Sequence, residues 1–289
     1  MPDYANRQSD IERIITEIID IKRWWFSLDE TNLEYHGLIA QVMHGHHLGE
    51  SLDQLQEKLT ADYTRYQELV KENDDLWMDL AEIEADSNFR ATLNAYKSRR
   101  PYEELLSIDG ASNGNVINKQ VMAQEIVMEL VGMAFGRWNI RYAAQPETIP
   151  PFGNVFDALP FMPVVSFQSE EAQLYPLTLP TDGILIGDDQ HPDSLVKRVQ
   201  EVMHSLWKND ADEMESELCQ LIGVDSLQTY LESPNGFFDY HFKRYTKSRR
   251  KAPIYWPVSS PEGEITLWVY YPQLSSQTLP HLLLLLSKD

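Results

Sequence analysis

Residues 52–83, LDQLQEKLTADYTRYQELVKENDDLWMDLAEI, give the clearest structural signal in the chain. Their apolar residues recur at alternating spacings of three and four, as in a heptad seam; these residues are Leu52, Leu55, Leu59, Tyr66, Leu69, Leu76, Leu80 and Ile83. Asp62 and Asn73 interrupt the seam, and polar residues at such positions commonly fix the register or the partner of a helix pair. We therefore predict one or two long antiparallel helices over residues 50–98.

The helices predicted on either side of this seam follow from similar spacing. Residues 9–28, SDIERIITEIIDIKRWWFSL, read as an amphipathic helix that packs on the seam, with Ser9 and Glu12 at capping-box spacing. A helix is also predicted over Leu33–Leu48. After a turn at residues 109–115, another apolar helix is predicted over Lys119–Phe135, ending near Gly136.

The character of the sequence changes after residue 144. Residues 145–192 are rich in proline and carry scattered aromatic side chains, which indicates an ordered, looping connector on a folded surface. Residues 193–289 then predict two helices, over 193–208 and 211–222. They also predict a hairpin of two strands, 254–258 and 265–271, and a short closing helix over 276–286. We expect a mainly α fold with a small β hairpin, divided into a helical domain (1–144), this connector, and a C-terminal α+β region (193–289).

Composition limits the possible functions. The formal charge of −21 opposes nonspecific binding to nucleic-acid phosphate or anionic lipid, so any DNA contact has to be local. A single cysteine, Cys219, excludes intramolecular disulfides and fits a reducing compartment, so we expect a cytoplasmic protein. The longest apolar run, Leu282–Leu286, is far below the roughly 20 residues that cross a bilayer, and no membrane role is expected.

One basic segment stands out in this acidic chain. Six of the nine residues from Lys243 to Lys251 are Lys or Arg. Aromatic side chains lie close to them in sequence, a combination suited to phosphate contacts and base stacking. The predicted DNA-binding residues are Lys243, Arg244, Lys247, Arg249, Arg250, Lys251, Tyr255 and Trp256. Alternatively, these cations neutralise the acidic helices within residues 201–232.

The sequence gives little sign of catalysis or of a cofactor. There is no G-x-G-x-x-G or Walker A loop and no H-E-x-x-H. The one G-x-S-x-G string, GASNG at residues 110–114, lies in the predicted turn at 109–115 and has no predicted strand before it. The spacing of His36, His44, His46 and His47 does not suit one metal site, so a solvated helix end is favoured. Cys219 fits a core thiol better than a nucleophile. We expect no catalytic residue, no cofactor and no metal.

Two stretches carry a resemblance to a known family. GMAFGRWNIRY (132–142) resembles the VGxxFGRWDxR segment of the large adenine-specific DNA methyltransferases of type IIG restriction–modification and of BREX and DISARM phage-defence systems, with Asn139 where Asp is commoner. FDYHFKRYTKSRRKAPIYW (238–256) is similar to the region C-terminal to their catalytic domain. Shorter matches in that region are YP (175–176), DGIL (182–185), HPD (191–193) and WVYY (268–271). The resemblance covers about residues 120–280.

The catalytic domain of that family has no counterpart in this sequence. The family transfers a methyl group from S-adenosylmethionine through a glycine-containing loop and an Asn/Asp-Pro-Pro-Tyr/Phe motif. The nearest string here is IPPF (149–152), and Ile149 offers no oxygen to the amino group of a flipped base. The resemblance therefore implies a noncatalytic C-terminal subunit or fragment that works with a methyltransferase catalytic subunit or domain, and with DNA in the complex.

Within this hypothesis the motif residues have different predicted roles. We expect three of them to anchor their helix to the proline-rich connector: Arg137, Trp138 and Arg141. The alternative for the two arginines is that they pair with the chain's own carboxylates. Two alternatives from other classes remain at this stage. The charge of −21 also fits an acidic interaction protein or DNA mimic, and a metal-dependent nuclease is a weaker third possibility because no two-metal carboxylate motif is recognisable.

Overall fold

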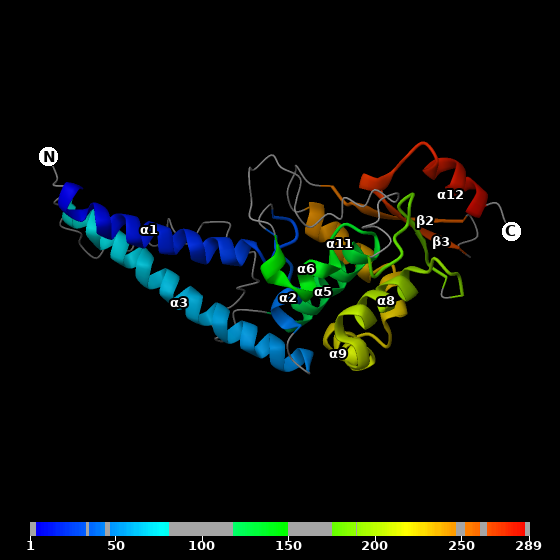
Figure 1. Cartoon of the computed structure of the whole chain (residues 1–289), viewed down its shortest axis with the longest axis horizontal. Coiled ribbons are helices and arrows are strands. Elements are labelled where there is room, and N and C mark those ends of the chain that lie inside the picture. The colour runs from blue at the N-terminus through cyan, green and yellow to red at the C-terminus, as the bar shows by residue number, and fades with distance from the viewer. Residues whose placement is uncertain are drawn as a thin grey trace.

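The computed structural model describes residues 4–32, 35–43, 47–80, 118–149, 175–188, 190–246, 252–260 and 265–286. Two long helices, α1 (Tyr4–Phe26) and α3 (Leu48–Leu80), lie side by side and form an arm that projects from a body built by most of the remaining elements (Figure 1). The N-terminus lies at the far end of the arm and the C-terminus at the opposite end of the molecule. The structure is mostly helical with a small sheet, which confirms the predicted fold class.

The predicted seam is the surface through which α3 packs on α1. Leu59 and Leu69 of α3 and Ile14 of α1 are fully buried. The helices run antiparallel, because Arg13 near the start of α1 pairs with Glu72 near the end of α3. At the other end of the arm, Trp25 makes an edge contact with Tyr66. The seam therefore has its helical partner within the same chain, where the burial of apolar side chains stabilises both helices.

Two predictions about the N-terminal helices are wrong. The helix predicted to begin at Ser9 begins at Tyr4 and runs through Ser9 and Glu12, because the S-x-x-E spacing also fits the interior of a helix. The helix predicted over Leu33–Leu48 is reduced in the described part of that stretch to one turn, α2 (Ile39–Val42). Residues 81–98 and the turn at 109–115 lie outside the described residues.

The body is organised around α5 (Lys119–Ala134). Asn118 caps it by accepting hydrogen bonds from the backbone N–H groups of Gln120 and Val121, and nearly all of its last thirteen residues are buried. Helices α8 (Leu195–Trp207) and α9 (Ala211–Ile222) pack against it, close to the ranges predicted from spacing. The remaining helical elements are α6 (Ile140–Ala144), η2 (Pro146–Thr148), η3 (Lys208–Asp210), α10 (Leu227–Glu232), α11 (Phe237–Thr246), η4 (Tyr271–Gln273) and α12 (Thr278–Leu286).

The sheet contains the predicted hairpin and one strand that sequence spacing missed. Strands β2 (Tyr255–Ser259) and β3 (Thr266–Tyr270) pair antiparallel as predicted. A third strand, β1 (Ile184–Ile186), comes from the proline-rich connector and pairs antiparallel with β3, so that the strand order is β1-β3-β2. The connector is therefore more than a loop, because it supplies an edge strand whose three residues are all buried.

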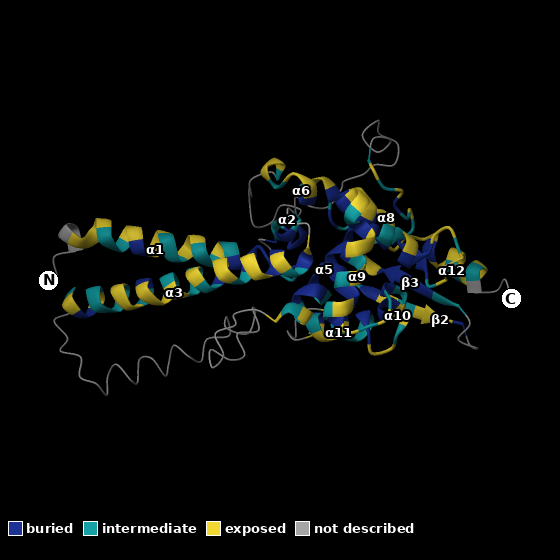
Figure 2. Ribbon diagram, turned by 90° about the horizontal axis from the view of Figure 1, so that it is seen from below, coloured by how far each residue is buried: buried dark blue, intermediate teal, exposed yellow. Residues whose placement is uncertain are grey.

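Burial is concentrated in the body and at the base of the arm (Figure 2). One cluster of buried hydrophobic side chains includes Trp25 of α1, Leu59 of α3, Ile126 of α5 and Trp268 of β3. The division into parts at residues 144 and 192 stays a prediction, although this shared core joins elements from the first and last parts. No described helix has the length and apolar character that a membrane span requires.

Candidate functional site

The FGRW stretch (135–138) forms the turn that directly follows α5. Trp138 folds back onto α5 so closely that a Cβ atom on Gly132 would lie 2.3 Å from its ring, which explains the glycine at that position. Gly136 adopts a positive φ of 77°, a conformation that glycine accepts at little cost. Asn139 then caps α6 by accepting a hydrogen bond from the backbone N–H of Arg141. This turn fixes the direction in which Arg137 leaves the backbone.

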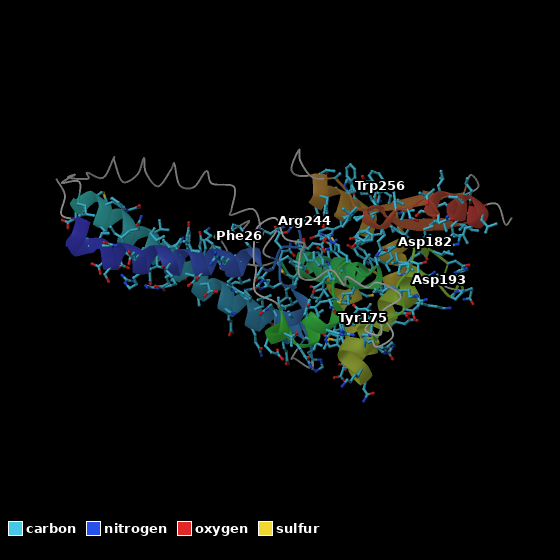
Figure 3. All side chains as sticks on the ribbon, turned by 45° about the horizontal axis from the view of Figure 1, so that its top comes forward. Phe26, Tyr175, Asp182, Asp193, Arg244 and Trp256 are labelled. Atoms are coloured by element: carbon cyan, nitrogen blue, oxygen red, sulfur yellow. The ribbon has the colours of Figure 1, made fainter. Side chains whose placement is uncertain are left out.

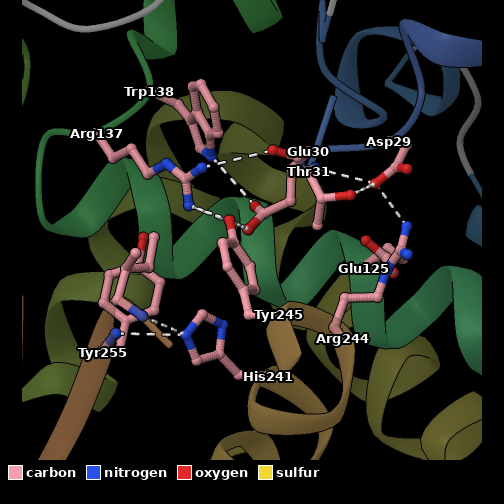
Figure 4. Close-up of polar contacts among 11 residues, drawn as sticks. Asp29, Glu30, Thr31, Glu125, Arg137, Trp138, His241, Arg244, Tyr245 and Tyr255 are labelled. Carbon is pink, nitrogen blue, oxygen red and sulfur yellow. Dashed lines mark hydrogen bonds and ion pairs between the residues drawn. The ribbon is translucent and has the colours of Figure 1, made fainter. Parts of the chain in front are cut away.

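Arg137 points into the body, where it pairs with Glu30 at the base of the arm (Figure 4). Arg137 Nη1 lies 3.2 Å from Glu30 Oε1, and the hydroxyl of Tyr245 donates to the same oxygen at 2.6 Å. Trp138 Nε1 donates to Glu30 Oε2 at 3.3 Å. Burial by itself would lower the pKa of Arg137, but the Glu30 carboxylate holds that pKa well above its usual value. Arg137 therefore stays charged inside the fold.

A second buried ion cluster lies beside the first. Arg244 of α11 donates from Nη2 to Asp29 at 2.6 Å and from Nε to Glu125 at 2.5 Å. The hydroxyl of Tyr240 also donates to Glu125. Burial raises the pKa of Glu125, against the opposing effects of Arg244 and this hydroxyl. Arg244 thus connects α11, α5 and the end of α1, and Figure 3 shows it where the arm meets the body.

His241 joins α11 to the sheet as a neutral imidazole. Its Nε2 accepts hydrogen bonds from the backbone N–H groups of Ile254, at 3.0 Å, and Tyr255, at 3.3 Å. Burial lowers its pKa to about 3, and the nearby charge of Arg137 acts in the same direction. Nδ1 therefore carries the proton, and it has no hydrogen-bond partner among the described residues. His241 can therefore accept the two backbone N–H groups only while it stays uncharged.

Glu129 serves a comparable structural purpose at α2. Its Oε2 accepts hydrogen bonds from the backbone N–H groups of Leu38 and Ile39, at 2.8 and 2.9 Å. A Cβ atom on Gly37, which has a φ of +98°, would lie 2.6 Å from Glu129 Oε1. Burial raises the pKa of Glu129 to about 7, although the donated hydrogen bonds lower it. This carboxylate holds the chain between α1 and α3 against α5.

The outer surface of α11 and β2 carries what we call the aromatic–lysine face, made of Phe242, Lys243 and Trp256. Phe242 and Trp256 are each 42% exposed, and both ring systems contact Phe238 between them. The Lys243 side chain is 73% exposed and pairs with Asp239 one helical turn away. Trp256 lies at the outer edge of the body in Figure 3. Flat rings beside an ammonium group can stack on bases and contact phosphates.

The structure separates the predicted DNA-binding residues into different groups. Lys243 and Trp256 lie on the surface as that role requires. Tyr255 is fully buried and stacks on Phe135, so it is not available to stack on a base. The described contacts of Arg244 are with Asp29 and Glu125, so pairing with the chain's own acids is favoured for it over a phosphate contact. Lys247, Arg249, Arg250 and Lys251 lie outside the described residues.

For Arg244, the alternative of pairing with the chain's own acids is right, but the acids are not the expected ones. Acidic helices within residues 201–232 were the expected partners, whereas the carboxylates that pair with Arg244 come from residues 29 and 125. Arg137 likewise pairs with the chain's own Glu30. Arg141 instead fulfils the prediction of an anchor to the connector, since its guanidinium lies over the ring of Tyr175 at 5.3 Å from the centroid.

The two other candidate groups from sequence differ in outcome. Cys219 is buried, and burial raises the pKa of its thiol, as expected for a core cysteine. Among the described histidines of the tract, His47 is paired with Glu213 and Glu217 of α9, so it is more than part of a solvated helix end. His44 and His46 lie outside the described residues.

Comparison with known proteins adds no identification. No family model matches the chain, and no curated protein matches it either.

The carboxylates that complete the two ion clusters were not found from sequence. Asp29 and Glu30 follow the predicted N-terminal helix, and Glu125 lies in an otherwise apolar helix. In a chain with 45 acidic residues, an isolated acid carries little information. The one available signal was the position of Glu125 and Glu129 in the apolar run of α5, because acids are rarely buried unless paired.

Proposed function

We propose that this chain is a noncatalytic part of a DNA adenine methyltransferase assembly of phage defence, in which it assists DNA recognition or docks a subunit. The observation that carries the proposal is the aromatic–lysine face, which lies within the stretch that resembles the methyltransferase family. Phe242 and Trp256 keep large exposed ring surfaces there, and Lys243 adds a cation beside them. Exposed aromatic rings of this kind are common where proteins bind partners or single nucleic-acid strands.

The geometry beneath this face supports a fixed recognition surface. Arg244 and Tyr245 hold α11 to Asp29 and Glu30, and His241 holds it to β2. Both elements that present the face are therefore tied to the buried core, and little ordering is needed when a ligand binds. The other stretch of the resemblance, residues 132–142, contributes Arg137 to the same support, because Arg137 donates a hydrogen bond to the hydroxyl of Tyr245.

The proposed role involves no methyl transfer by the chain itself. The sequence has no S-adenosylmethionine loop and no Asn/Asp-Pro-Pro-Tyr/Phe motif. Titration calorimetry of the chain with S-adenosylmethionine should therefore show no binding. Micromolar affinity would overturn the noncatalytic assignment. The single cysteine is in keeping with a cytoplasmic assembly.

The test begins with the partner. The tagged chain is expressed in its source cells and purified at low salt, and co-purifying proteins are identified by mass spectrometry. An adenine methyltransferase in stoichiometric amount supports the proposal. Recovery of the chain with a basic DNA-binding protein and without a methyltransferase would select the acidic interaction protein or DNA mimic instead, which the charge of −21 favours.

The second step asks whether the face contacts DNA in that complex. Lys243→Gln should weaken DNA binding, lower the salt slope of log K by about 0.9 and leave the melting temperature unchanged. The pair Arg249→Gln and Arg250→Gln should act in the same direction. Trp256→Ala should weaken binding, while Trp77→Ala on the arm is the matched control, since Trp77 is 41% exposed. Equal DNA affinity for both tryptophan variants, with an unchanged salt slope for Lys243→Gln, would assign the face to subunit docking or to no function.

A further inference from the structure

A histidine and two glutamates from distant parts of the chain meet where the arm joins the body. His47 directly precedes α3, and Glu213 and Glu217 lie one turn apart on α9. His47 Nδ1 lies 2.9 Å from Glu217 Oε1 and 3.4 Å from Glu213 Oε1. The three ligand atoms all lie within 4.8 Å of one another, and His47 and Glu213 are exposed. A small ion can therefore reach them from solvent.

The two distances from His47 Nδ1 to the glutamate oxygens fit the coordination sphere of a small transition-metal ion. Zinc binds histidine nitrogen and carboxylate oxygen at about 2.0–2.2 Å with tetrahedral geometry, so that adjacent ligand atoms lie about 3.3–3.6 Å apart. The two distances from His47 Nδ1, 2.9 and 3.4 Å, are within a few tenths of an ångström of that edge. One nitrogen and two oxygens also form a donor set that zinc accepts.

The surrounding groups hold one ligand in place and favour a cation. Glu217 Oε2 accepts a hydrogen bond from the backbone N–H of Gly49 at 3.0 Å, which orients the carboxylate and leaves Oε1 facing His47. Glu50, in the first turn of α3, adds a further negative charge nearby. Lys119, whose ammonium group reaches the carbonyl of Gly49, is paired with Asp53. Outer hydrogen bonds such as the one from Gly49 fix the ligands of protein metal sites.

We propose that His47, Glu213 and Glu217 form a binding site for Zn²⁺ or a similar divalent transition metal, with water completing the coordination. The bound ion links the start of α3 to α9 and so fixes the arm on the body. Without metal, the same residues form a His–Glu ion pair, which accounts for the local contacts but predicts no dependence on metal. This inference is independent of the proposed function, because none of the three residues belongs to the aromatic–lysine face.

The test is a titration of the metal-stripped full-length chain with zinc sulfate, followed by calorimetry and by thermal melting. We expect one ion per chain with micromolar affinity, and a melting temperature that rises with the zinc concentration. Co²⁺ in place of zinc should give the visible absorption of tetrahedral coordination. Glu213→Gln should weaken zinc binding at least tenfold and abolish the zinc-dependent rise in melting temperature, and His47→Gln should do the same.

Two matched variants distinguish this site from a general effect of lost charge and from zinc binding elsewhere in the histidine tract. Asp212→Asn is the control for the lost charge, because Asp212 lies on the same helix and also faces a histidine, His204; it should leave zinc affinity unchanged. A double variant, His44→Gln with His46→Gln, removes the two histidines nearest to His47 in sequence and should retain the site. Zinc binding that survives Glu213→Gln, or that is lost in the double variant alone, would overturn the proposal, as would no binding by the unaltered chain.

Discussion

The buried pair of Arg137 and Glu30 gives the sharpest test of how the fold is held together. Arg137→Met keeps the length of the apolar stem but removes the guanidinium. Glu30, with a side chain 1% exposed, would then be left as a buried carboxylate whose remaining side-chain hydrogen bonds from described residues come from Tyr245 and Trp138. Removing one partner of a buried pair costs about 3–5 kcal/mol. For a chain of this size that cost corresponds to a fall in melting temperature of about 6–20 °C.

The control and the second variant make this prediction specific. Arg13→Met removes an arginine from an exposed pair on the arm, with both side chains nearly half exposed, and should cost less than about 1 kcal/mol. Calorimetry and urea unfolding of Arg137→Met, Glu30→Gln and the double variant complete a thermodynamic cycle. Its coupling energy should be about 1.5–3 kcal/mol. If Arg137→Met loses no more stability than Arg13→Met, the argument that this pair anchors the arm is incorrect.

Three further predictions concern the arm and two buried titratable groups. Leu69→Asp places a charge at a fully buried position of the seam, so it should lower the free energy of unfolding by at least about 3 kcal/mol and reduce the helical circular dichroism. An unchanged spectrum and melting temperature would show that the seam does not hold the two helices together. His241 has a pKa of about 3 in the fold, below its ordinary value of 6.5, so the stability from its neutral form is present above pH 6.5 and is lost as the pH falls toward 3. His241→Gln should therefore flatten the acid side of a plot of melting temperature against pH. An acid slope identical to that of the unaltered chain would count against this role. Glu129 has a pKa of about 7, above its ordinary value of 4.5, so the stability contributed by its protonated form is fully present below pH 4.5 and is lost as the pH rises through 7. The free energy of unfolding of Glu129→Gln, relative to that of the unaltered chain, should therefore rise by about 3 kcal/mol between pH 4.5 and 8. A difference in stability between the two proteins that stays constant across that range would contradict the shift.

Local spacing predicted the helices whose apolar faces are continuous in sequence. Helices α8 and α9 and the seam of α3 were found because residues three and four apart share one face. The same rule failed over Leu33–Leu48, where the backbone N–H groups of Leu38 and Ile39 bind the side chain of Glu129 from a distant helix. Strand β1 was missed for a related reason, because three residues show no period and their partner strand lies some 80 residues later.

The candidate site was predicted only in part, for an electrostatic reason. The sequence identified Arg137 and Arg244 as notable residues, but their partners depend on the three-dimensional fold. Glu30 is 107 residues from Arg137, and Asp29 is 215 residues from Arg244. An acidic chain offers every arginine many possible partners, and only burial selects among them. Sequence could therefore suggest that these arginines pair internally without indicating the acids involved.

The structure also changes how substitutions in the two family-like stretches should be interpreted. Arg137, His241, Arg244, Tyr245 and Tyr255 all support the core through buried contacts. If the chain binds DNA as proposed, changing any of these residues should weaken that binding through weakened folding alone, so such a loss would not show that the residue contacts DNA. Within the described part of these stretches, the aromatic–lysine face offers side chains that can be changed without breaking a buried ion pair. Evidence for direct contact must come from that face, with stability measured on the same variants.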